Sequence, residues 1–458
     1  MYKKSSTLFL FLYFFASYIC FAQLKPVYSF QNDDSVLKRN FYNLSRQKTE
    51  LLIAALGKEN QKDYKKVYEE RLGQTEDLLL STRTVTDPVP HKYLQSILDK
   101  IIVANPELKN IDARVIFTRD WWPNAYSMGD GTIAVNAGLL TYLDNEAELV
   151  YILGHELAHY FLDHSGKAIK KYVETINSDT FKEELKRISK QQFRQNQEFE
   201  KLYKKTIFDN RKHSRDKEAE ADKWALKFIK QTGYDGMAVK TALQKLDTID
   251  AVTFLKPLDI QQVFSFADYS FKDKWIKDES SVFSKLTEED ASDLSKKERD
   301  SLKTHPDCSI RIEALKDSLS QIKGKLFLVD EKTFNRLKTD FKVEITEQCF
   351  KNNNISRNLY YSLQMLDNTA YHPLAILSVS RGLNNIYEAQ KKHKLDDLID
   401  EEGRYYPKDY NMLLRLLNRI RLDELLAINY FFCKKYGEEM KGYAGFEEET
   451  KRLEKNRN

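Results

Sequence analysis

The sequence predicts a mainly α-helical protein that contains a small β-sheet and ends in an α-helical, repeat-like C-terminal domain. Apolar residues recur at three- and four-residue spacing through most of the chain, which is the period of an amphipathic helix. Only 15 of the 458 residues are Gly and 9 are Pro, which argues against an all-β fold with many tight turns. A chain of this length has room for two or three domains.

The N-terminus has the pattern of a cleaved signal peptide at residues 1–22. Two lysines precede an apolar run over residues 8–21, and Cys20 and Ala22 are small residues at the two positions that a signal peptidase reads. We therefore expect a mature chain that begins at Gln23 and is located outside the cytoplasm, in the periplasm. A lipid anchor on Cys20 and an uncleaved membrane anchor are the alternatives. The large isoleucine before Cys20 and the shortness of the apolar run disfavour them.

The chain then alternates between helical and β patterns. A helical segment at residues 23–83 ends at the Pro-containing stretch 84–90, and a further helix is expected at residues 91–103. Alternating and β-branched residues predict three short strands, at residues 113–118, 124–128 and 132–135. The last two flank Gly129-Asp130-Gly131, and an Asp-Gly pair between such runs is typical of a β-hairpin turn.

Two later regions are helical in pattern. Residues 165–210 are highly charged, and are either a lid or amphipathic hairpin that touches a membrane or partner, or a solvated helical pair packed on the protein core. Interspersed charges of both signs favour the solvated pair. Residues 321–458 have the apolar spacing of helices similar to tetratricopeptide-type repeats, without a regular period. The expected domains are therefore 23–83, a central domain at 84–320, and a C-terminal domain at 321–458.

The net charge and the cysteine content bear on nucleic-acid binding and on disulfide bonds. The net charge of +4 gives no reason to expect nucleic-acid binding. Three cysteines follow the expected cleavage site, Cys308, Cys349 and Cys433. An odd number is not a disulfide framework, and it allows either one bridge with one free thiol or three buried thiols.

A His-Glu-x-x-His motif at residues 155–159 carries the predicted chemistry. His155 and His159 are four residues apart, so one face of a helix presents both imidazoles to one ion. Glu156 then lies beside the ion, where it can act as the general base that takes a proton from the attacking water. The pattern therefore predicts a catalytic zinc site.

A catalytic zinc site needs a third protein ligand and one open position. His164 lies five residues after His159, which does not match a metzincin spacing, so we expect a helix-end residue there. Glu218 and Asp222 are four residues apart and share a helix face. We predict that Glu218 is the third ligand, that Asp222 accepts a hydrogen bond from a ligating imidazole, and that one Zn²⁺ binds per chain.

With these motifs, the chain resembles the gluzincin metallopeptidase family that includes the CAAX prenyl proteases and the membrane protease HtpX. It is most similar to the soluble periplasmic members with a helical-repeat tail. The resemblance covers roughly residues 85 to 320, and the matching segments occur in the same order as in the family. The matching segments are 124–126 with 131–140, 148–159, 214–222 and 305–315.

The resemblance implies a zincin-like α+β protease domain with zinc ligands at His155, His159 and Glu218. Asn124 would belong to a substrate-binding edge strand. His305 and Arg311 would lie near the metal and either gate it or stabilise the oxyanion. The membrane-spanning helices of the prenyl proteases are missing from the pattern, which disfavours lipid-modified substrates.

We therefore expect a zinc-dependent endopeptidase that hydrolyses misfolded or unfolded extracytoplasmic proteins. A substrate would add as a β-strand along residues 131–136, and recognition through its backbone would be weakly selective. Partners on the membrane surface or among envelope proteins fit this location, and the sequence does not predict an oligomeric state. The alternative is a chaperone or adaptor whose helical tail binds clients and whose zinc site is gated or silent. A zinc hydrolase that does not act on peptides is disfavoured by the four matching segments.

Overall fold

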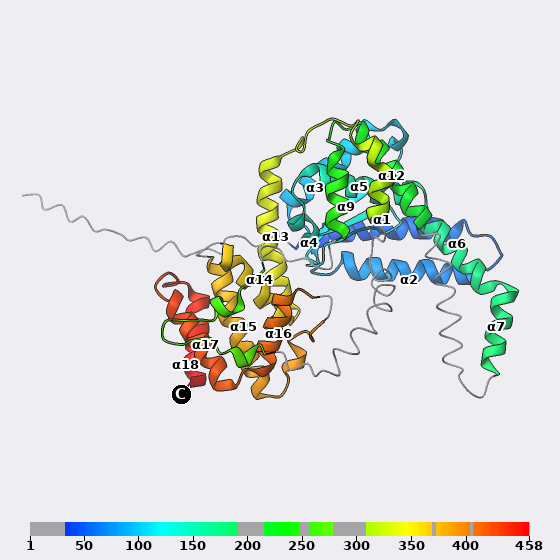
Figure 1. Ribbon diagram of the computed structural model, residues 1–458. Coiled ribbons are helices and arrows are strands. Elements are labelled where there is room, and N and C mark those ends of the chain that lie inside the picture. The colour runs from blue at the N-terminus through cyan, green and yellow to red at the C-terminus, as the bar shows by residue number, and fades with distance from the viewer. Residues whose placement is uncertain are drawn as a thin grey trace, which may run out of the picture.

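The computed structural model describes residues 33–190, 215–247, 257–277, 308–368, 372–403 and 406–457. Over these ranges the protein is mainly helical with one small sheet, which confirms the predicted fold class (Figure 1). The predicted signal peptide and His305 lie outside the described residues. Within the described ranges, no helix has both the length and the apolar character that a membrane crossing requires.

The first part of the chain forms two helices, the sheet and the helices that pack on it. The elements are α1 (Ser35–Ala54), α2 (Gln61–Leu79), β1 (Thr84–Val85), α3 (Pro88–Ala104), η1 (Pro106–Leu108), β2 (Arg114–Thr118), β3 (Ala125–Ser127), β4 (Thr132–Asn136), α4 (Ala137–Tyr142), α5 (Glu146–Phe161), α6 (His164–Asn177), α7 (Asp179–Ser189), a helix over residues 215–230, and α9 (Met237–Asp247).

In the second part, the regular elements among the described residues are helices joined by loops. The elements are α10 (Ile260–Val263), η3 (Asp273–Trp275), α12 (Cys308–Leu319), α13 (Glu331–Lys351), α14 (Ile355–Asn368), α15 (Pro373–Lys391), η4 (Leu395–Asp397), α16 (Lys408–Arg419), α17 (Leu422–Tyr436) and α18 (Ala444–Arg457).

The sheet has the order β1-β2-β4-β3, in which only β2 and β4 are parallel. The three predicted strands are confirmed, and β3 and β4 form the predicted antiparallel hairpin. Gly129 and Gly131 adopt φ of 80° and 97° in its turn, a region that glycine enters without a steric penalty. The short β1 was not predicted, because it lies in the stretch that was interpreted only as a break between helices.

The predicted position of the substrate on residues 131–136 is wrong. Thr132–Asn136 form β4, whose two edges are already hydrogen-bonded to β2 and β3. All five residues of β4 are buried, so this strand has neither a free edge nor a free face. The edge strands of the sheet are β1 and β3, and β3, whose outer edge is open, packs beside α5.

Side chains alternate across β2 and β4, and this alternation explains why both strands are buried on two faces. Ile116 and Ala134 face one side, where they pack with Phe41 of α1 and with Leu78 and Leu79 of α2. The opposite face belongs to the larger core with α3 and α5, and it carries Val115, Phe117, Ile133 and Val135. The α1–α2 pair therefore covers the face of the sheet that the catalytic-motif helix leaves exposed.

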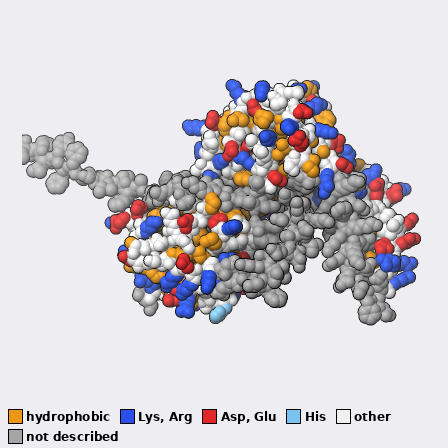
Figure 2. Space-filling model, viewed as in Figure 1, with side chains coloured by type: hydrophobic (Ala, Val, Ile, Leu, Met, Phe, Trp, Pro, Cys, Tyr) orange, Lys and Arg blue, Asp and Glu red, His pale blue; other side chains and the backbone are white. Residues whose placement is uncertain are grey.

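The described residues form two main hydrophobic cores, and each contains segments from both sides of the predicted domain boundary at residue 320. The first core contains the sheet, α3, α5, α9 and α12, and continues into α13 as far as Ile345. The second core contains α14 to α18 and includes Leu258 and Trp275 from the segment at residues 257–277. Helix α13 runs from one body to the other (Figure 1). On the face in Figure 2, charges of both signs are interspersed over both bodies.

Candidate metal centre and active site

Helix α5 carries the His-Glu-x-x-His motif in the interior of the first core. The side chain of Asn145 caps its first turn by accepting a hydrogen bond from the Glu148 N–H at 3.0 Å. A helix over residues 215–230 packs closely against α5, because the residues at the contact are small. Ala225 is fully buried and faces Gly154. This contact brings the Glu218 side chain to the two histidines.

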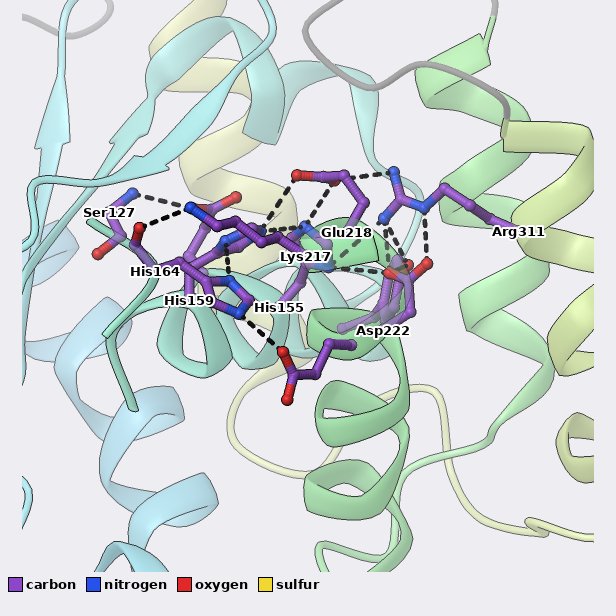
Figure 3. Close-up of polar contacts among 11 residues, drawn as sticks. Ser127, His155, His159, His164, Lys217, Glu218, Asp222 and Arg311 are labelled. Carbon is purple, nitrogen blue, oxygen red and sulfur yellow. Dashed lines mark hydrogen bonds and ion pairs between the residues drawn. The ribbon is translucent and has the colours of Figure 1, made fainter. Parts of the chain in front are cut away.

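The three predicted ligands converge on one point. The Nε2 atoms of His155 and His159 lie 3.0 Å apart, and each lies 3.3 Å from a carboxylate oxygen of Glu218 (Figure 3). A tetrahedral metal ion with bonds of about 2.0–2.1 Å separates its ligand atoms by about 3.3 Å. The two nitrogens and the carboxylate therefore fit one small metal ion, and they form the cluster with metal-binding geometry among the described residues.

Glu156 lies between this cluster and the open edge of the sheet. Its side chain is buried, and its Oε2 accepts a hydrogen bond of 2.9 Å from the backbone N–H of Ser127 in β3. Both residues line an open cavity of about 360 Å³, together with His159, Glu218 and residues of α6. The predicted base thus faces the space that a substrate would occupy, and the edge strand fixes its direction.

Asp222 holds His155 from the side away from this cavity. Its Oδ1 lies 2.9 Å from His155 Nδ1, and it accepts a hydrogen bond of 2.8 Å from the Tyr151 hydroxyl. Arg311 binds both carboxylate oxygens, with its Nε 2.7 Å from Oδ2 and its Nη2 2.6 Å from Oδ1. Burial raises the pKa of Asp222, but the hydrogen bonds from Arg311 and His155 outweigh it and hold the pKa well below its usual range.

The same contacts act on the titration of the ligand. Burial lowers the pKa of His155, but its hydrogen bonds to Asp222 and Glu218 outweigh this effect and raise the pKa to about 10. Because a metal ion binds the unprotonated imidazole, a proton on this ring would compete with the metal ion.

Arg311 also reaches the third predicted ligand, since its Nη1 lies 3.5 Å from Glu218 Oε2. Arg311 lies beside Asp222 and Glu218, and it is buried in the contact between α12 and the 215–230 helix (Figure 3). This position suits a residue that orients Asp222 and Glu218 better than one that contacts an oxyanion. Asn124 lines the cavity just before β3. The roles predicted for His305 stay predictions, because it lies outside the described residues.

The fold and the site geometry agree with the comparison with known families. A sequence profile described as peptidase family M48 matches residues 88–319, just over half of the chain. The chain belongs to peptidase family M48. The match runs from the first residue of α3 to the last residue of α12, and this M48 region contains every predicted site residue.

Two curated proteins are similar to parts of this M48 chain. Metalloprotease YcaL of Escherichia coli (strain K12) is 28% identical over 140 residues, which are 31% of this chain and 52% of that protein. A putative beta-barrel assembly-enhancing protease of Vibrio cholerae is 24% identical over 87 residues, which are 19% of this chain and 18% of that protein. The chain thus spans about half the length of the first relative and under a fifth of the second.

Three features of the M48 site were missed by sequence reasoning. Tyr151 lies one helical turn before His155 and could have been found from that spacing. The N–H of Ser127 is a backbone group and leaves no mark in the sequence. His164 was expected to be a helix-end residue. It is the first residue of α6, and it also contacts His159, with their Nδ1 atoms 2.9 Å apart.

The cysteines take no part in this site. Cys308, Cys349 and Cys433 are all buried, and no disulfide joins them. Burial raises the pKa of the Cys349 thiol to about 12 and that of Cys433 to about 11. Of the two alternatives that the odd count allowed, the structure has three buried thiols.

Proposed function

We propose that this protein is a zinc-dependent endopeptidase that hydrolyses unfolded or misfolded proteins outside the cytoplasm. The observation that carries the proposal is the triangle of two imidazole nitrogens and one carboxylate, with sides of 3.0 and 3.3 Å, beside the Glu156 carboxylate. Two histidines and a glutamate are a ligand set of catalytic zinc in proteases, and three protein ligands leave a fourth position open.

A bound zinc ion would act as a Lewis acid and lower the pKa of water at the site toward about 7. The remaining chemistry belongs to the chain. Glu156 accepts a proton from the attacking water and later delivers it to the leaving amine. The Ser127 N–H keeps the carboxylate turned toward the cavity. Asp222 keeps the Nδ1 proton of His155 in place, so that Nε2 faces the metal position.

We propose that the substrate pairs with β3 as an added strand. In the antiparallel β3–β4 ladder, the hydrogen-bonded positions are marked by the bonds from Asn136 N to Asn124 O and from Met128 N to Thr132 O. Because hydrogen-bonding direction alternates along a strand, the N–H and C=O of Ala125 point to the open edge. Main-chain pairing there recognises any extended chain, and unfolded proteins offer extended segments that folded ones do not.

The proposed location and substrate source have independent support. The apolar run at residues 8–21 supports export from the cytoplasm. Similarity to a putative beta-barrel assembly-enhancing protease supports envelope proteins as the class from which substrates come.

The test is cleavage of an unfolded protein under control of the metal. Purified full-length protein is incubated with casein as isolated, after treatment with a chelator, and after zinc is added back. We expect peptides cut at many internal positions, loss of cleavage after chelation, and recovery with about one equivalent of zinc per chain. Cleavage that survives complete metal removal would contradict the proposal, and so would a fully zinc-loaded protein that leaves casein intact.

A further inference from the structure

The two histidines of the metal centre are held by different partners. The distal nitrogen of His155 contacts a carboxylate directly, at 2.9 Å from Asp222. The distal nitrogen of His159 contacts a third imidazole, because its Nδ1 lies 2.9 Å from Nδ1 of His164. The other nitrogen of His164, Nε2, lies 3.2 Å from Oε2 of Glu220. His159, His164 and Glu220 therefore form a continuous chain of polar contacts that leads away from the ligand cluster.

One arrangement of protons satisfies every contact in this chain. The Nε2 of His159 faces His155 and Glu218. If this nitrogen binds the metal ion, the proton of the neutral His159 ring must be on Nδ1. That N–H can donate to His164 only if Nδ1 of His164 carries a lone pair. His164 must then hold its proton on Nε2, and this is the nitrogen that faces the Glu220 carboxylate, which accepts it. Each nitrogen thus fixes the tautomer of the next ring.

We propose that His164, assisted by Glu220, is a positioning residue that holds the His159 ring with Nε2 toward the metal. The proposal rests on the metal site under "Proposed function". Ligating histidines usually donate their second N–H to a carboxylate, carbonyl or water, and such partners orient the ring and increase its basicity as a ligand. Here a buried neutral imidazole takes that place for one ligand, while a carboxylate serves the other.

The backbone between α5 and α6 is built to bring His164 to this place. Helix α5 ends at Phe161, and Asp163 adopts a left-handed conformation with φ of 51°, which is uncommon for a residue other than glycine. The Asp163 carboxylate then caps α6 by accepting a hydrogen bond of 3.1 Å from the Gly166 N–H. A Cβ atom at Gly166 would lie 2.5 Å from that carboxylate, so a larger residue there would push the capping side chain out of this position.

The 215–230 helix fixes His164 from the other side. Lys217 Nζ donates a hydrogen bond of 3.0 Å to the His164 carbonyl, and Glu220 lies one turn further along the same helix. His164 is 5% exposed, whereas the Glu220 side chain is 50% exposed. Solvent therefore weakens the outer contact much more than the inner one. Loss of His164 should accordingly cost more metal affinity than loss of Glu220.

The experiment measures the zinc affinity of the full-length protein by competition with a chromophoric chelator. We expect His164→Ala to weaken zinc binding about 10- to 100-fold. His164→Asn keeps an oxygen acceptor near the position of Nδ1 and should recover part of the loss. Glu220→Ala should weaken binding less than His164→Ala does. Lys170→Ala, an exposed change in the same helix α6, is the control and should leave zinc affinity unchanged.

The double variant His164→Ala with Glu220→Ala tests the order of the chain of contacts. Because Glu220 acts through His164, we expect the double variant to bind zinc about as tightly as His164→Ala alone. Losses that simply add would overturn the proposed arrangement. Zinc affinity of His164→Ala within about twofold of the wild type would overturn the proposal itself, while wild-type protein that binds no zinc would overturn the metal site on which it rests.

A spectroscopic measurement keeps the proposal testable if His164→Ala does not fold. In the zinc-loaded wild type with ¹⁵N-labelled histidine, two-bond ¹H–¹⁵N correlations report which ring nitrogen carries the proton. We expect a neutral His164 with its proton on Nε2 and a His159 with its proton on Nδ1. A His164 protonated on Nδ1 alone, or on both nitrogens, could not accept from His159 and would overturn the proposal.

Discussion

At the scale of single residues, each side chain of the site is held in its functional direction by a second buried group. Asp222 orients His155, and it is in turn held by two hydrogen bonds from Arg311 and one from Tyr151. Arg311 and Asp222 are both buried, so each charge depends on the other for compensation. The metal site is therefore sensitive to groups that never touch the metal.

Arg311→Lys tests this dependence at constant charge. A lysine ammonium cannot make the two parallel hydrogen bonds of the guanidinium, so Asp222 is left incompletely paired in a buried position. We expect the metal-free protein to lose about 1–3 kcal/mol of unfolding free energy, measured in urea. Arg46→Lys removes a guanidinium from an exposed pair with Glu50, and should cost under about 1 kcal/mol. Equal effects of the two changes would contradict the account.

The sequence could predict the ligands but not their supports, and the reason is physical. His155 with His159, and Glu218 with Asp222, share helix faces by a spacing that helical geometry fixes locally. The contact between His159 and His164 depends on the left-handed conformation of Asp163, which no residue type there specifies. Arg311 lies far along the chain and was found only through the family resemblance.

At the scale of elements, α5 connects the site to the rest of the first core at both ends. Its C-terminal turn carries the ligands, and its first residue, Glu146, is fully buried. The Glu146 carboxylate accepts hydrogen bonds from the N–H groups of Leu328, Val329 and Asp330 at 2.7–2.9 Å, and from the hydroxyls of Tyr93 and Tyr234 at 3.0 Å. This carboxylate therefore anchors the start of α13 to the start of α5.

Glu146 gives the stability a predictable dependence on pH. Burial raises its pKa, but the hydrogen bonds from the backbone outweigh this and lower the pKa below the usual value for glutamate. A depressed folded-state pKa contributes stability above the unfolded pKa of about 4.3, and this contribution is lost as the pH falls through the folded pKa.

We therefore expect Glu146→Gln to lower the unfolding free energy by about 1.5–3 kcal/mol at pH 7, measured by urea denaturation. The difference from the wild type should shrink as the pH falls below about 4. Glu183→Gln, on an exposed part of α7, is the control and should show no such trend. A difference that stays constant down to pH 3 would show that the charge of Glu146 does not carry the effect.

Strand order was the part of the fold that local pattern could not provide. The hairpin was predicted from an Asp-Gly pair between two β-branched runs, which is a local property. The central place of β4 depends on β2, which pairs with it from a distance along the chain. The run Ile133-Ala134-Val135 is continuously apolar, and that pattern is typical of strands buried on both faces rather than of edge strands.

At the scale of the whole molecule, α13 joins two bodies into one packed unit. Phe341 of α13 packs edge-to-face on Phe117 of β2 with ring centroids 4.8 Å apart, and Glu344 forms a buried ion pair with Arg119. In the second body, Arg357 of α14 lies 3.8 Å from the ring of Trp121, which precedes the hairpin. These contacts fix the helical C-terminal body relative to the sheet. Each of them joins a residue before the predicted boundary at residue 320 to a residue after it.

Phe341→Ala tests whether α13 belongs to the catalytic core. Removing this fully buried ring leaves a cavity against β2, and we expect a loss of about 3–5 kcal/mol of unfolding free energy. Phe341→Leu keeps most of the volume and should cost less. A loss under about 1 kcal/mol for Phe341→Ala would mean that α13 contributes little to the first core.

The central claim is that this M48 chain holds one metal ion with His155, His159 and Glu218 while Glu156 acts as the base. The most direct measurement compares zinc content and casein cleavage for the wild type and Glu156→Gln. The amide keeps the size of the side chain and removes its basicity, and the three predicted ligands remain. We predict about one zinc per chain in both proteins and a loss of turnover of at least about 10²-fold in the variant. Cleavage by Glu156→Gln at a rate near that of the wild type, with zinc still bound, would contradict the account.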